Sequence, residues 1–312
     1  MIVLHWINSF LSYKSLEQII NLNKPIVWVL HDEFPFTGGC HYSGDCQKFV
    51  EKCCACPMLN SNKEKDISTC NYLDKARIYS KKKIYFLGPS NWIVSEAKKS
   101  SLLSDCSVKY IPNCLNVAIF EPKNKNELRK KYGIPCGKKV VLFGADNASL
   151  KYSIKGLSYL LDALKGLTTK DYYLIIFGNL SEQDIQGRVK QEHRLVGYVN
   201  EEEKLAELYS VADVMVVPSL QEAFGYTVCE AMACGTPVVA FSVGGILDQI
   251  EHKKNGYLAE CRNVKSLAEG IEYCAQNTEE LGKNAHRSAQ RFSQEFVGEK
   301  YKEYFEKILQ NR

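Results

Sequence analysis

One stretch of the chain, residues 218–240, decides the fold, and it reads Pro218-Ser-Leu-Gln-Glu222-Ala-Phe-Gly225-Tyr-Thr-Val-Cys-Glu230-Ala-Met-Ala-Cys-Gly235-Thr-Pro237-Val-Val-Ala240. It follows a β-rich run and predicts a loop, a helix and a second strand. Gly235 is typical of a helix C-cap, and Pro237 stops the helix. In an open parallel sheet, a loop at the carboxyl end of a strand lies where ligands bind.

The start of the predicted helix is a candidate phosphate-binding site. The first backbone N–H groups of a helix have no carbonyl partner within the helix itself. The helix dipole adds partial positive charge, so such a helix start attracts phosphate. Gly225 permits a close approach of the backbone. The candidate residues are Phe224, Gly225, Tyr226 and Thr227.

Two glutamates, separated by seven residues, flank this helix start. Glu230 lies about five residues beyond Gly225, roughly 7.5 Å along a helix axis, which suits the reach from a diphosphate to a ribose. A diphosphate repels a carboxylate, so Glu222 and Glu230 fit this site only if each accepts hydrogen bonds from sugar or ribose hydroxyls. The alternative is two solvated acids. Their spacing and context favour ligand binding.

From residue 140 onward, β-rich runs alternate with amphipathic helical stretches such as Gly156–Leu167 and Glu202–Val211. This alternation predicts an α/β fold with parallel sheets covered by helices. The expected strands are Val140–Gly144, Tyr173–Gly178, Leu195–Val199, Val214–Val217 and Val238–Phe241, preceded by Ile2–His5, Ile26–His31, Ile84–Leu87 and Val108–Ile111.

The composition is that of an ordinary water-soluble chain. Of 312 residues, 45% are apolar and 24% are charged, which excludes a disordered or fibrous protein. The net charge of +4 is too small to indicate a nucleic-acid partner. Neither a signal peptide nor an apolar run of about 18 residues is recognisable, so we expect a cytosolic protein. Lys81-Lys82-Lys83 and Lys98-Lys99 read as solvated faces, with peripheral association with an anionic inner membrane surface as the alternative.

The length predicts two domains. The polar segment Lys123–Glu127 is typical of a linker, so the expected division is residues 1–122 and residues 123–295. Residues 296–312 predict an aromatic, Lys/Glu-rich helix that packs back toward the N-terminal domain. Residues 36–83 are too long for an ordinary connection and indicate a functional or metal-braced loop.

Six of the thirteen cysteines fall between residues 40 and 70. Four of them have the spacing C-x5-C-x6-C-x2-C, which suits a closed, structural zinc site. Four unliganded thiols are an equal alternative, and Cys54 and His41 leave the ligand set ambiguous. The candidate ligands are Cys40, Cys46, Cys53 and Cys56.

The residues quoted above resemble those of a known family. The pattern PSxxEgFGxxxxEAMAxGxPVVA, followed by Gly244-Gly245, is similar to that of the retaining family-four glycosyltransferases (glycosyl transferases group 1), with Glu222 and Glu230 at the two acidic positions. The resemblance implies a GT-B fold, which has two Rossmann-like lobes and holds a nucleotide-sugar donor mainly in the C-terminal lobe.

Two further donor contacts follow from the resemblance. In this family the first strand of the C-terminal lobe usually precedes a Gly-Arg pair and then Lys-Gly, and the two cations hold the donor diphosphate. This chain has Gly144-Ala145 and Lys155-Gly156, so the lysine is carried over and the arginine is missing unless Lys151 replaces it. A solvated lysine is the alternative for Lys155, but lysine is a usual phosphate ligand.

His31 resembles the family's N-lobe histidine on the acceptor side of the transferred sugar. It ends a β-rich run, and strand ends of this kind border a ligand cleft, although such a histidine is often only structural. The segment Pro35–Tyr42 that follows is similar to bacterial surface-polysaccharide glycosyltransferases of the colanic acid or O-antigen type.

The resemblance therefore implies transfer of a sugar, with retention, from a nucleotide-diphosphate sugar to a hydroxyl of a growing surface glycan or lipid-linked saccharide. By this resemblance Glu222 binds the transferred sugar and Glu230 binds the ribose. Lys155 and the helix start stabilise the departing diphosphate, and His31 lies on the acceptor side. No catalytic metal is expected, because fixed positive groups take its place.

The alternative is a catalytically silent, N-terminally truncated fragment or a nucleotide-sugar-binding module. Members of the family normally begin with two or three further βαβ units, and a strand like Ile2–His5 usually lies well inside their N-terminal lobe. We therefore expect an incomplete N-terminal lobe with an unpaired sheet edge. A zinc-dependent nucleic-acid binder is a weaker reading, because the net charge is modest.

Overall fold

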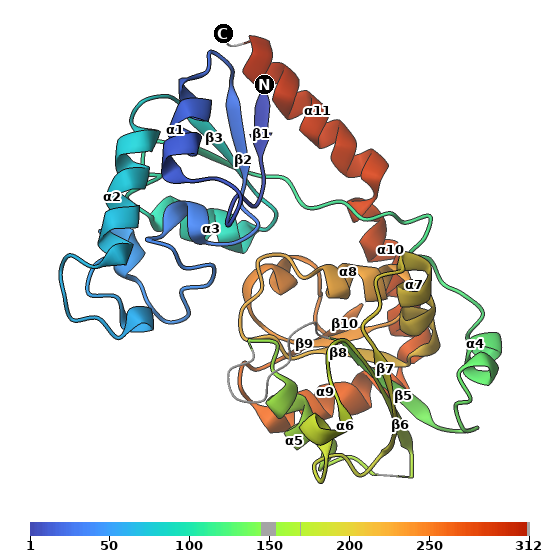
Figure 1. Ribbon diagram of the computed structural model, residues 1–312. Coiled ribbons are helices and arrows are strands. Elements are labelled where there is room, and N and C mark those ends of the chain that lie inside the picture. Colours follow the sequence, from blue (N-terminus) through green and yellow to red (C-terminus); the bar gives the residue numbers. More distant parts are fainter. Residues whose placement is uncertain (145–153, 169, 311–312) are drawn as a thin grey trace. The chain divides into compact units, whose positions relative to one another are not determined.

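The computed structural model describes residues 1–144, 154–168 and 170–310 (Figure 1). The chain forms two units. The first unit comprises Met1–Asn113 and Val297–Arg312, and the second comprises Cys114–Phe296. Each has its own sheet and is described by itself.

The first unit is built on a four-stranded parallel sheet with the order β1-β2-β3-β4. Its strands are β1 (Ile2–Leu4), β2 (Ile26–Val29), β3 (Ile84–Gly88) and β4 (Ser107–Tyr110). Its helices are α1 (Tyr13–Asn21), α2 (Ile67–Tyr79), α3 (Asn91–Lys99) and all but the start of α11 (Gln294–Gln310). Successive strands are parallel, so each connection must cross back over the sheet.

Opposite faces of this sheet are covered by different helices. Val27 and Val29 of β2 belong to one apolar cluster with residues of α11. Trp28 lies between them in sequence and its side chain points to the other face, where its ring contacts Tyr79 of α2. All four residues of β2 are buried, as expected for a strand covered on both faces.

The second unit is built on a six-stranded parallel sheet with the order β10-β9-β8-β5-β6-β7. Its strands are β5 (Lys139–Gly144), β6 (Tyr172–Phe177), β7 (Glu192–Gly197), β8 (Val214–Val217), β9 (Val238–Phe241) and β10 (Gly256–Ala259). Its helices are α4 (Lys125–Lys131), α5 (Leu157–Leu164), α6 (Glu182–Ile185), α7 (Glu202–Val211), α8 (Tyr226–Ala233), α9 (Val264–Gln276) and α10 (Thr278–Ala289).

The order of the strands reverses between β5 and β8. From β5 the chain adds β6 and β7 on one side, and it then crosses to add β8, β9 and β10 on the other. Residues of β5 alternate between two cores, with Val140 and Leu142 in one and Val141 and Phe143 in the other. Ligands of doubly wound sheets bind outside the carboxyl ends of the strands at such a reversal. The segments that follow β5 and β8 are therefore the place to look for a site.

The predicted fold class, α/β with parallel sheets, is confirmed. All nine expected strands occur, and the predicted C-cap at Gly235 is formed, because Gly235 and Thr236 donate to the carbonyls of Met232 and Ala231. The sequence did not reveal β10, a four-residue strand that begins with glycine. None of the described helices is long and apolar enough to cross a membrane.

Two details differ from the expected division. The boundary between the units lies at Asn113, ahead of the expected linker at Lys123, because Leu115 and Phe120 are buried in the core of the second unit. Residues 36–83 are also not one loop, since they contain α2.

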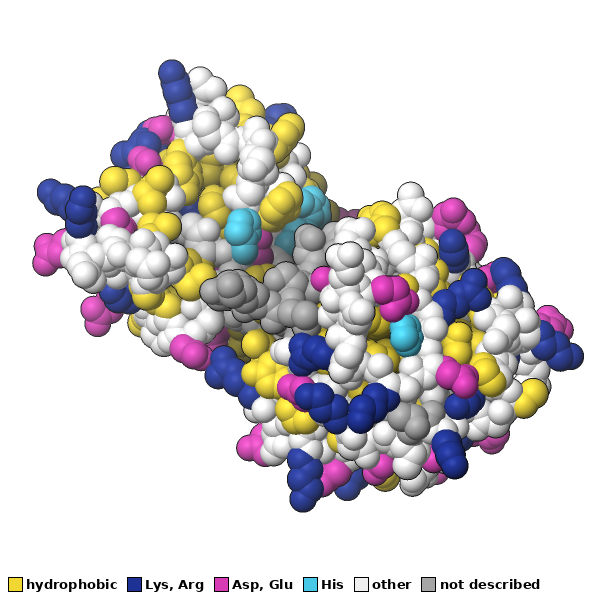
Figure 2. All heavy atoms as spheres, turned by 60° about the horizontal axis from the view of Figure 1, so that its bottom comes forward, with side chains coloured by type: hydrophobic (Ala, Val, Ile, Leu, Met, Phe, Trp, Pro, Cys, Tyr) yellow, Lys and Arg dark blue, Asp and Glu magenta, His cyan; other side chains and the backbone are white. Residues whose placement is uncertain are grey.

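Charges are mixed on the surface. On the face drawn in Figure 2, basic and acidic side chains are interspersed. Of the lysines considered for a membrane contact, Lys81 pairs with Glu17 and Lys99 with Glu96. These pairs reduce the positive charge that an anionic surface would meet and favour the interpretation as solvated faces.

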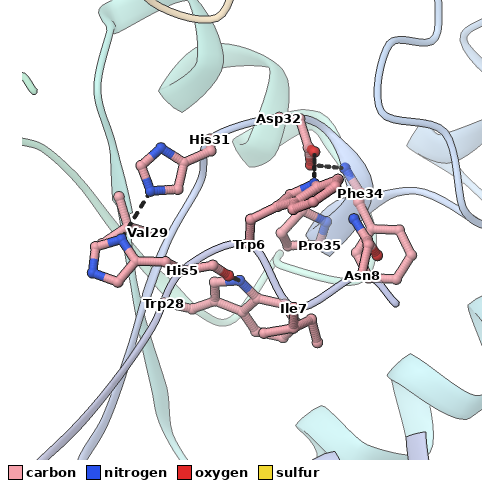
Figure 3. A pocket seen from close by; sticks show the side chains of 10 residues that line it. All are labelled: His5, Trp6, Ile7, Asn8, Trp28, Val29, His31, Asp32, Phe34 and Pro35. Atoms are coloured by element: carbon pink, nitrogen blue, oxygen red, sulfur yellow. Dashed lines mark hydrogen bonds between the residues drawn. The ribbon is translucent and has the colours of Figure 1, made fainter. Parts of the chain in front are cut away.

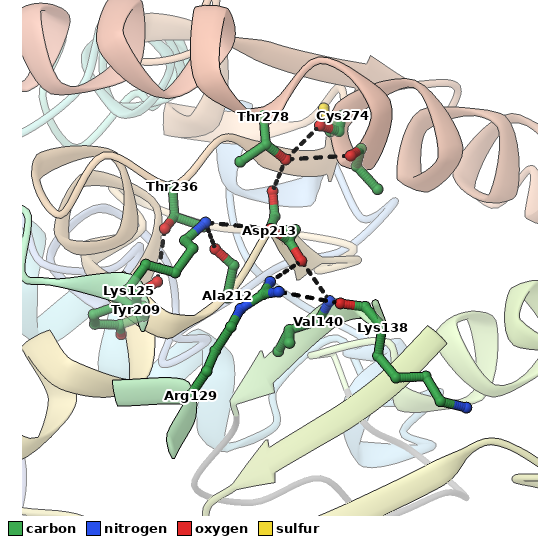
Figure 4. A network of polar contacts seen from close by, with 11 residues as sticks. Lys125, Arg129, Lys138, Val140, Tyr209, Ala212, Asp213, Thr236, Cys274 and Thr278 are labelled. Carbon is green, nitrogen blue, oxygen red and sulfur yellow. Dashed lines mark hydrogen bonds and ion pairs between the residues drawn. The ribbon is translucent and has the colours of Figure 1, made fainter. Parts of the chain in front are cut away.

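A polar network fixes α4 to the edge of the core (Figure 4). Asp213, which is only 5% exposed, precedes β8. Its carboxylate accepts hydrogen bonds from Arg129 at 2.5 Å, from the backbone N–H of Val140 at 2.7 Å and from Lys125 at 3.3 Å. One carboxylate thus ties α4 and the start of β5 to β8.

We expect Asp213→Ala to destabilise the protein strongly, because it leaves two cations and a buried N–H group without their acceptor. Breaking a largely buried ion pair from one side should lower the free energy of unfolding by about 3 kcal/mol. Urea unfolding followed by far-ultraviolet circular dichroism measures this.

Asp162→Ala is the matched control, since Asp162 also pairs with a lysine and an arginine but is 40% exposed at its side chain. Its loss should cost about 1 kcal/mol or less. Equal losses in the two variants would contradict the assignment of Asp213 as a buried anchor.

Candidate active site

The helix start predicted to bind phosphate is present at the carboxyl end of β8. Helix α8 begins at Tyr226, and Gly225 forms its N-cap with φ +90°, a conformation that favours glycine. The side chain of Phe224 is 3% exposed and packs against Phe292, so only its backbone is available to a ligand. Tyr226 and Thr227 in the first turn are at least partly exposed. The buried ring of Phe224 therefore anchors the start of α8.

Lys155 and Glu222 come together beside this helix start. Lys155 Nζ donates to Glu222 Oε2 at 2.8 Å. The two residues are 67 positions apart in sequence, but they follow β5 and β8, which are paired neighbours. Lys155 is partly exposed, whereas Glu222 is almost buried. The ion pair thus places a cation at the same strand ends as the helix dipole.

Close backbone contacts hold the lysine segment in place. The backbone N–H of Leu220 donates to the carbonyl of Ile154 at 2.8 Å. Gly156 has φ +73°, and a Cβ atom there would lie 1.8 Å from the carbonyl oxygen of Pro218. Only glycine allows this approach, so Gly156 determines where Lys155 sits.

Gly144, a predicted donor contact, has a packing role in the structure. It ends β5, and a Cβ atom there would lie 2.0 Å from the ring of Phe177. The position of the Phe177 ring is therefore enough to require glycine at position 144. Ala145 and Lys151, the two positions considered for the missing arginine, lie outside the described residues.

Glu230 lies on α8, one turn beyond its first residues, and has a partner that the sequence did not reveal. The hydroxyl of Tyr209, on α7, donates to Glu230 Oε2 at 2.7 Å. Burial raises the pKa of Glu230 above its ordinary value, and the bond from Tyr209 opposes this. Tyr209 is fully buried, so the phenol fixes one carboxylate oxygen. The other oxygen is the candidate acceptor for a ribose hydroxyl.

His31 lies in the first unit, just beyond the carboxyl end of β2 (Figure 3). Its Nε2 is 2.8 Å from Nδ1 of His5, which follows β1, and the two rings are stacked. Burial, and then the neighbouring His5, lower the pKa of His31. His31 is therefore a neutral imidazole near pH 7, able to donate from one nitrogen and accept at the other.

A second group of side chains is centred on Asp32, the residue after His31. The indole N–H of Trp6 donates to Asp32 Oδ2 at 3.0 Å, and Nδ1 of His41 lies 2.6 Å from the same oxygen. The backbone N–H of Phe34 donates to the other carboxylate oxygen. Trp6, Asp32 and Phe34 line a narrow pocket together with His5 and His31, and polar atoms of these residues are paired with one another (Figure 3). Pairing of this kind fixes the orientation of the loop after β2.

The predicted zinc site is not formed. Within the described residues, no group of three or more His, Cys, Asp or Glu side chains is arranged to hold a metal ion. Burial raises the pKa of Cys40 to about 12, and Cys56, Cys53 and Cys46 add to this shift. Cys53 and Cys56 are buried and Cys40 and Cys46 are half-buried, and the structure does not support the coordination shell expected at these four cysteines.

A buried lysine braces this part of the chain. Lys75 of α2 has no exposed surface, and its Nζ donates to the carbonyls of Phe34 and Thr37. It also lies 3.6 Å from the centre of the Phe34 ring. Burial lowers the pKa of Lys75 to about 7. Lys75 thus ties α2 to the segment that follows β2.

The structure brings Lys155, Glu222 and the start of α8 together in the second unit, with Glu230 one turn further along. His31 lies in the first unit, where its partner is His5. Tyr209 could not be found from the sequence, because a tyrosine on the apolar face of an amphipathic helix gives no sign of a polar partner.

Known proteins resemble this chain over most of its length. The family model described as Glycosyl transferases group 1 matches residues 124–292. An uncharacterized glycosyltransferase of Methanocaldococcus jannaschii is 31% identical over 252 residues, which cover 74% of this chain and 63% of that protein. The N-acetyl-alpha-D-glucosaminyl L-malate synthase of Bacillus anthracis is 28% identical over 206 residues, 64% of this chain and 53% of the synthase.

Solved structures agree on the fold. The HepE protein of Anabaena, solved with UDP and glucose, has a TM-score of 0.73 and 20% identity, covering 98% of this chain and 78% of HepE. At this identity the likeness shows the fold alone, which is the GT-B fold of two Rossmann-like lobes. The chain spans 63% and 53% of the lengths of the two relatives from M. jannaschii and B. anthracis.

We expect the stability of the first unit to fall as the pH rises from about 4.5 to 7, because burial raises the pKa of Glu33 from 4.5 to about 7. Below 4.5 both states hold the proton. Between the two values the unfolded chain ionises while the folded chain stays protonated, so the free energy of unfolding falls with pH, and above 7 both are ionised. Glu33→Gln should flatten this slope.

Tryptophan fluorescence during urea unfolding is the measurement, since Trp6, Trp28 and Trp92 all belong to the first unit. Glu64→Gln, at an exposed position, is the control and should keep the slope. A slope that persists in Glu33→Gln would show that another group titrates.

Proposed function

Because the chain belongs to the glycosyl transferases group 1, we propose that it transfers a sugar from a nucleotide-diphosphate sugar to a hydroxyl group of a growing surface glycan or lipid-linked saccharide. The observation that carries this proposal is the ion pair of Lys155 with Glu222 beside the start of α8. A helix start and a lysine together suit a diphosphate, which is the part that all such donors share.

The ion pair also explains how a carboxylate and a diphosphate share one site. Lys155 pairs with Glu222, so its charge offsets the repulsion between that carboxylate and a diphosphate at the helix start. Glu222, held by this contact, accepts hydrogen bonds from hydroxyls of the transferred sugar. Glu230, with one oxygen held by Tyr209, accepts those of the ribose.

The proposed reaction proceeds with retention at the anomeric carbon. The bond between that carbon and the diphosphate breaks first, and Lys155 and the N–H groups of the α8 start stabilise the negative charge that develops on the leaving group. The acceptor hydroxyl then adds on the same face, and its proton passes to a diphosphate oxygen. The step needs no protein nucleophile.

His31 is assigned to the acceptor side of the transferred sugar. Its lowered pKa keeps the ring neutral near pH 7, so it can hydrogen-bond a sugar hydroxyl in either direction. The adjoining Pro35–Tyr42 segment supports an acceptor of the surface-polysaccharide type. A lipid-linked acceptor would bring the chain to the inner membrane surface.

A nucleoside diphosphate should raise the thermal midpoint of the protein, because a ligand that binds only the native state stabilises it. The screen uses UDP, GDP and ADP, each beside its nucleoside. We expect one diphosphate to shift the midpoint by several degrees and its nucleoside by less. An unchanged thermal midpoint with all three diphosphates would refute donor binding.

Lys155→Ala should lower the turnover number by about a hundredfold, the usual cost of removing one preorganised charge from a developing anion. Glu222→Gln should reduce transfer while retaining nucleoside diphosphate binding, because it acts on the sugar. Donor hydrolysis and transfer assays measure both effects.

Lys165→Ala is the control, since Lys165 forms an ion pair of similar length with Asp162 on the surface of the same unit. Unchanged turnover in both site variants would sink the assignment. Binding of the diphosphate without hydrolysis or transfer in the wild type would instead indicate a nucleotide-sugar-binding module.

A further inference from the structure

The segment that follows β9 is pressed against the loop that carries Glu222. The backbone N–H of Gly245 donates to the carbonyl of Glu222 at 2.8 Å. A Cβ atom at Gly244 would lie 2.1 Å from that same carbonyl oxygen, and one at Gly245 would lie 2.4 Å from the carbonyl oxygen of Ala223. Backbone therefore packs on backbone, and the position of residues 222–225 depends on this segment.

Gln249 ends the segment and reaches under the same loop. Its side chain is completely buried. Nε2 donates to the carbonyl of Phe224 at 2.5 Å and makes a longer contact of 3.4 Å with the carbonyl of Gly225. One amide group thus holds two successive peptide units immediately before α8.

The shorter contact determines the direction of one N–H group. In a trans peptide the C=O and N–H bonds point in opposite directions. The Phe224 carbonyl belongs to the same peptide as the N–H of Gly225, whereas the Gly225 carbonyl already accepts hydrogen bonds from Val228 and Cys229 within α8. Because the Phe224 carbonyl turns toward Gln249, the N–H of Gly225 turns away from it, at the helix start where we place the diphosphate.

The backbone of Gln249 is itself anchored. Asn255 Nδ2 donates to the Gln249 carbonyl at 3.2 Å, and the guanidinium of Arg291 lies 3.4 Å from the same oxygen. Asn255 is 2% exposed and also accepts a hydrogen bond from the backbone N–H of Glu251. The donor of the contact to Phe224 is therefore held by fixed groups.

A polar residue at this position has an energetic cost. Within the described residues, Gln249 Oε1 is buried without a hydrogen-bond partner. An unpaired buried carbonyl destabilises a fold, and an apolar side chain would avoid this. What glutamine supplies and an apolar residue cannot is the N–H donor to the loop.

We propose that Gln249 is a positioning residue that preorganises the backbone N–H group of Gly225 for the donor diphosphate. The inference rests on the proposed function, since it assumes that the start of α8 receives a diphosphate. Gln249 acts through the backbone of residues 224–226 and does not itself contact the donor. Its loss weakens binding of the diphosphate and leaves binding of the nucleoside unchanged.

The structure offers a matched control in Gln191. Gln191 is 4% exposed, and its Nε2 donates to the carbonyls of Leu164 and Leu167, at the end of α5. It thus makes the same two-carbonyl contact in the same unit, away from α8. Gln249→Met and Gln191→Met each remove one buried amide that serves two carbonyls, so their effects on stability should be similar.

The test measures binding of UDP, GDP and ADP, and of uridine, guanosine and adenosine, by the wild type and both variants. We expect Gln249→Met to bind the preferred diphosphate about tenfold more weakly, the loss of roughly one hydrogen bond, with the nucleoside unchanged. Gln191→Met should match the wild type for both ligands. Gln249→Leu, a second apolar replacement without a donor, makes the same comparison if Gln249→Met does not fold.

Two outcomes separate the two proposals. If the wild type binds a diphosphate and both Gln249 variants keep the wild-type ratio of diphosphate to nucleoside affinity, Gln249 is merely structural and the inference is overturned. If the wild type binds no nucleoside diphosphate, the proposed function fails, and the inference fails with it.

Discussion

Hydrogen bonding between β5 and β8 joins the two halves of the larger sheet, because the chain extends from β5 in one direction and returns to build outward from β8 in the other. Parallel strands end at the same edge, so the segments after β5 and β8 must meet. For this reason Lys155 and Glu222 are neighbours and form an ion pair of 2.8 Å, although they are far apart in the sequence. The charge balance of the candidate site is thus a product of strand order.

Much of this site is made of backbone. Glycines at positions 156, 244 and 245 let chain segments approach more closely than any side chain would allow. Gly156 lets the segment that carries Lys155 pack against Pro218, and Gly244 and Gly245 pack against the loop that carries Glu222. Backbone donors fixed in this way lose little freedom when a ligand binds, which is the advantage of a preorganised site. Gln249 adds a side-chain donor to these backbone contacts.

Buried polar side chains connect elements that apolar packing alone leaves free to slide. Asp213 ties α4 to the start of β5, Tyr209 fixes Glu230, and Lys75 fastens α2 to the segment around Phe34. None of these partners was predictable from the sequence, because each pair is distant along the chain. The cysteine spacing, by contrast, was visible and misleading, since a spacing that suits zinc does not itself place four thiols in a coordination shell.

The sequence by itself determined the α/β class, nine of the ten strands in the described part of the chain, the glycine C-cap of α8 and the identity of the candidate donor residues. It could do so because alternation, turn residues and the E-x7-E spacing are local patterns, read over a few residues at a time. Only the tertiary structure decided that Lys155 neutralises Glu222, that Tyr209 holds Glu230 and that a lysine braces residues 36–83. These contacts join positions dozens of residues apart, and the order of strands in a sheet, which brings them together, leaves no mark in any single stretch of sequence.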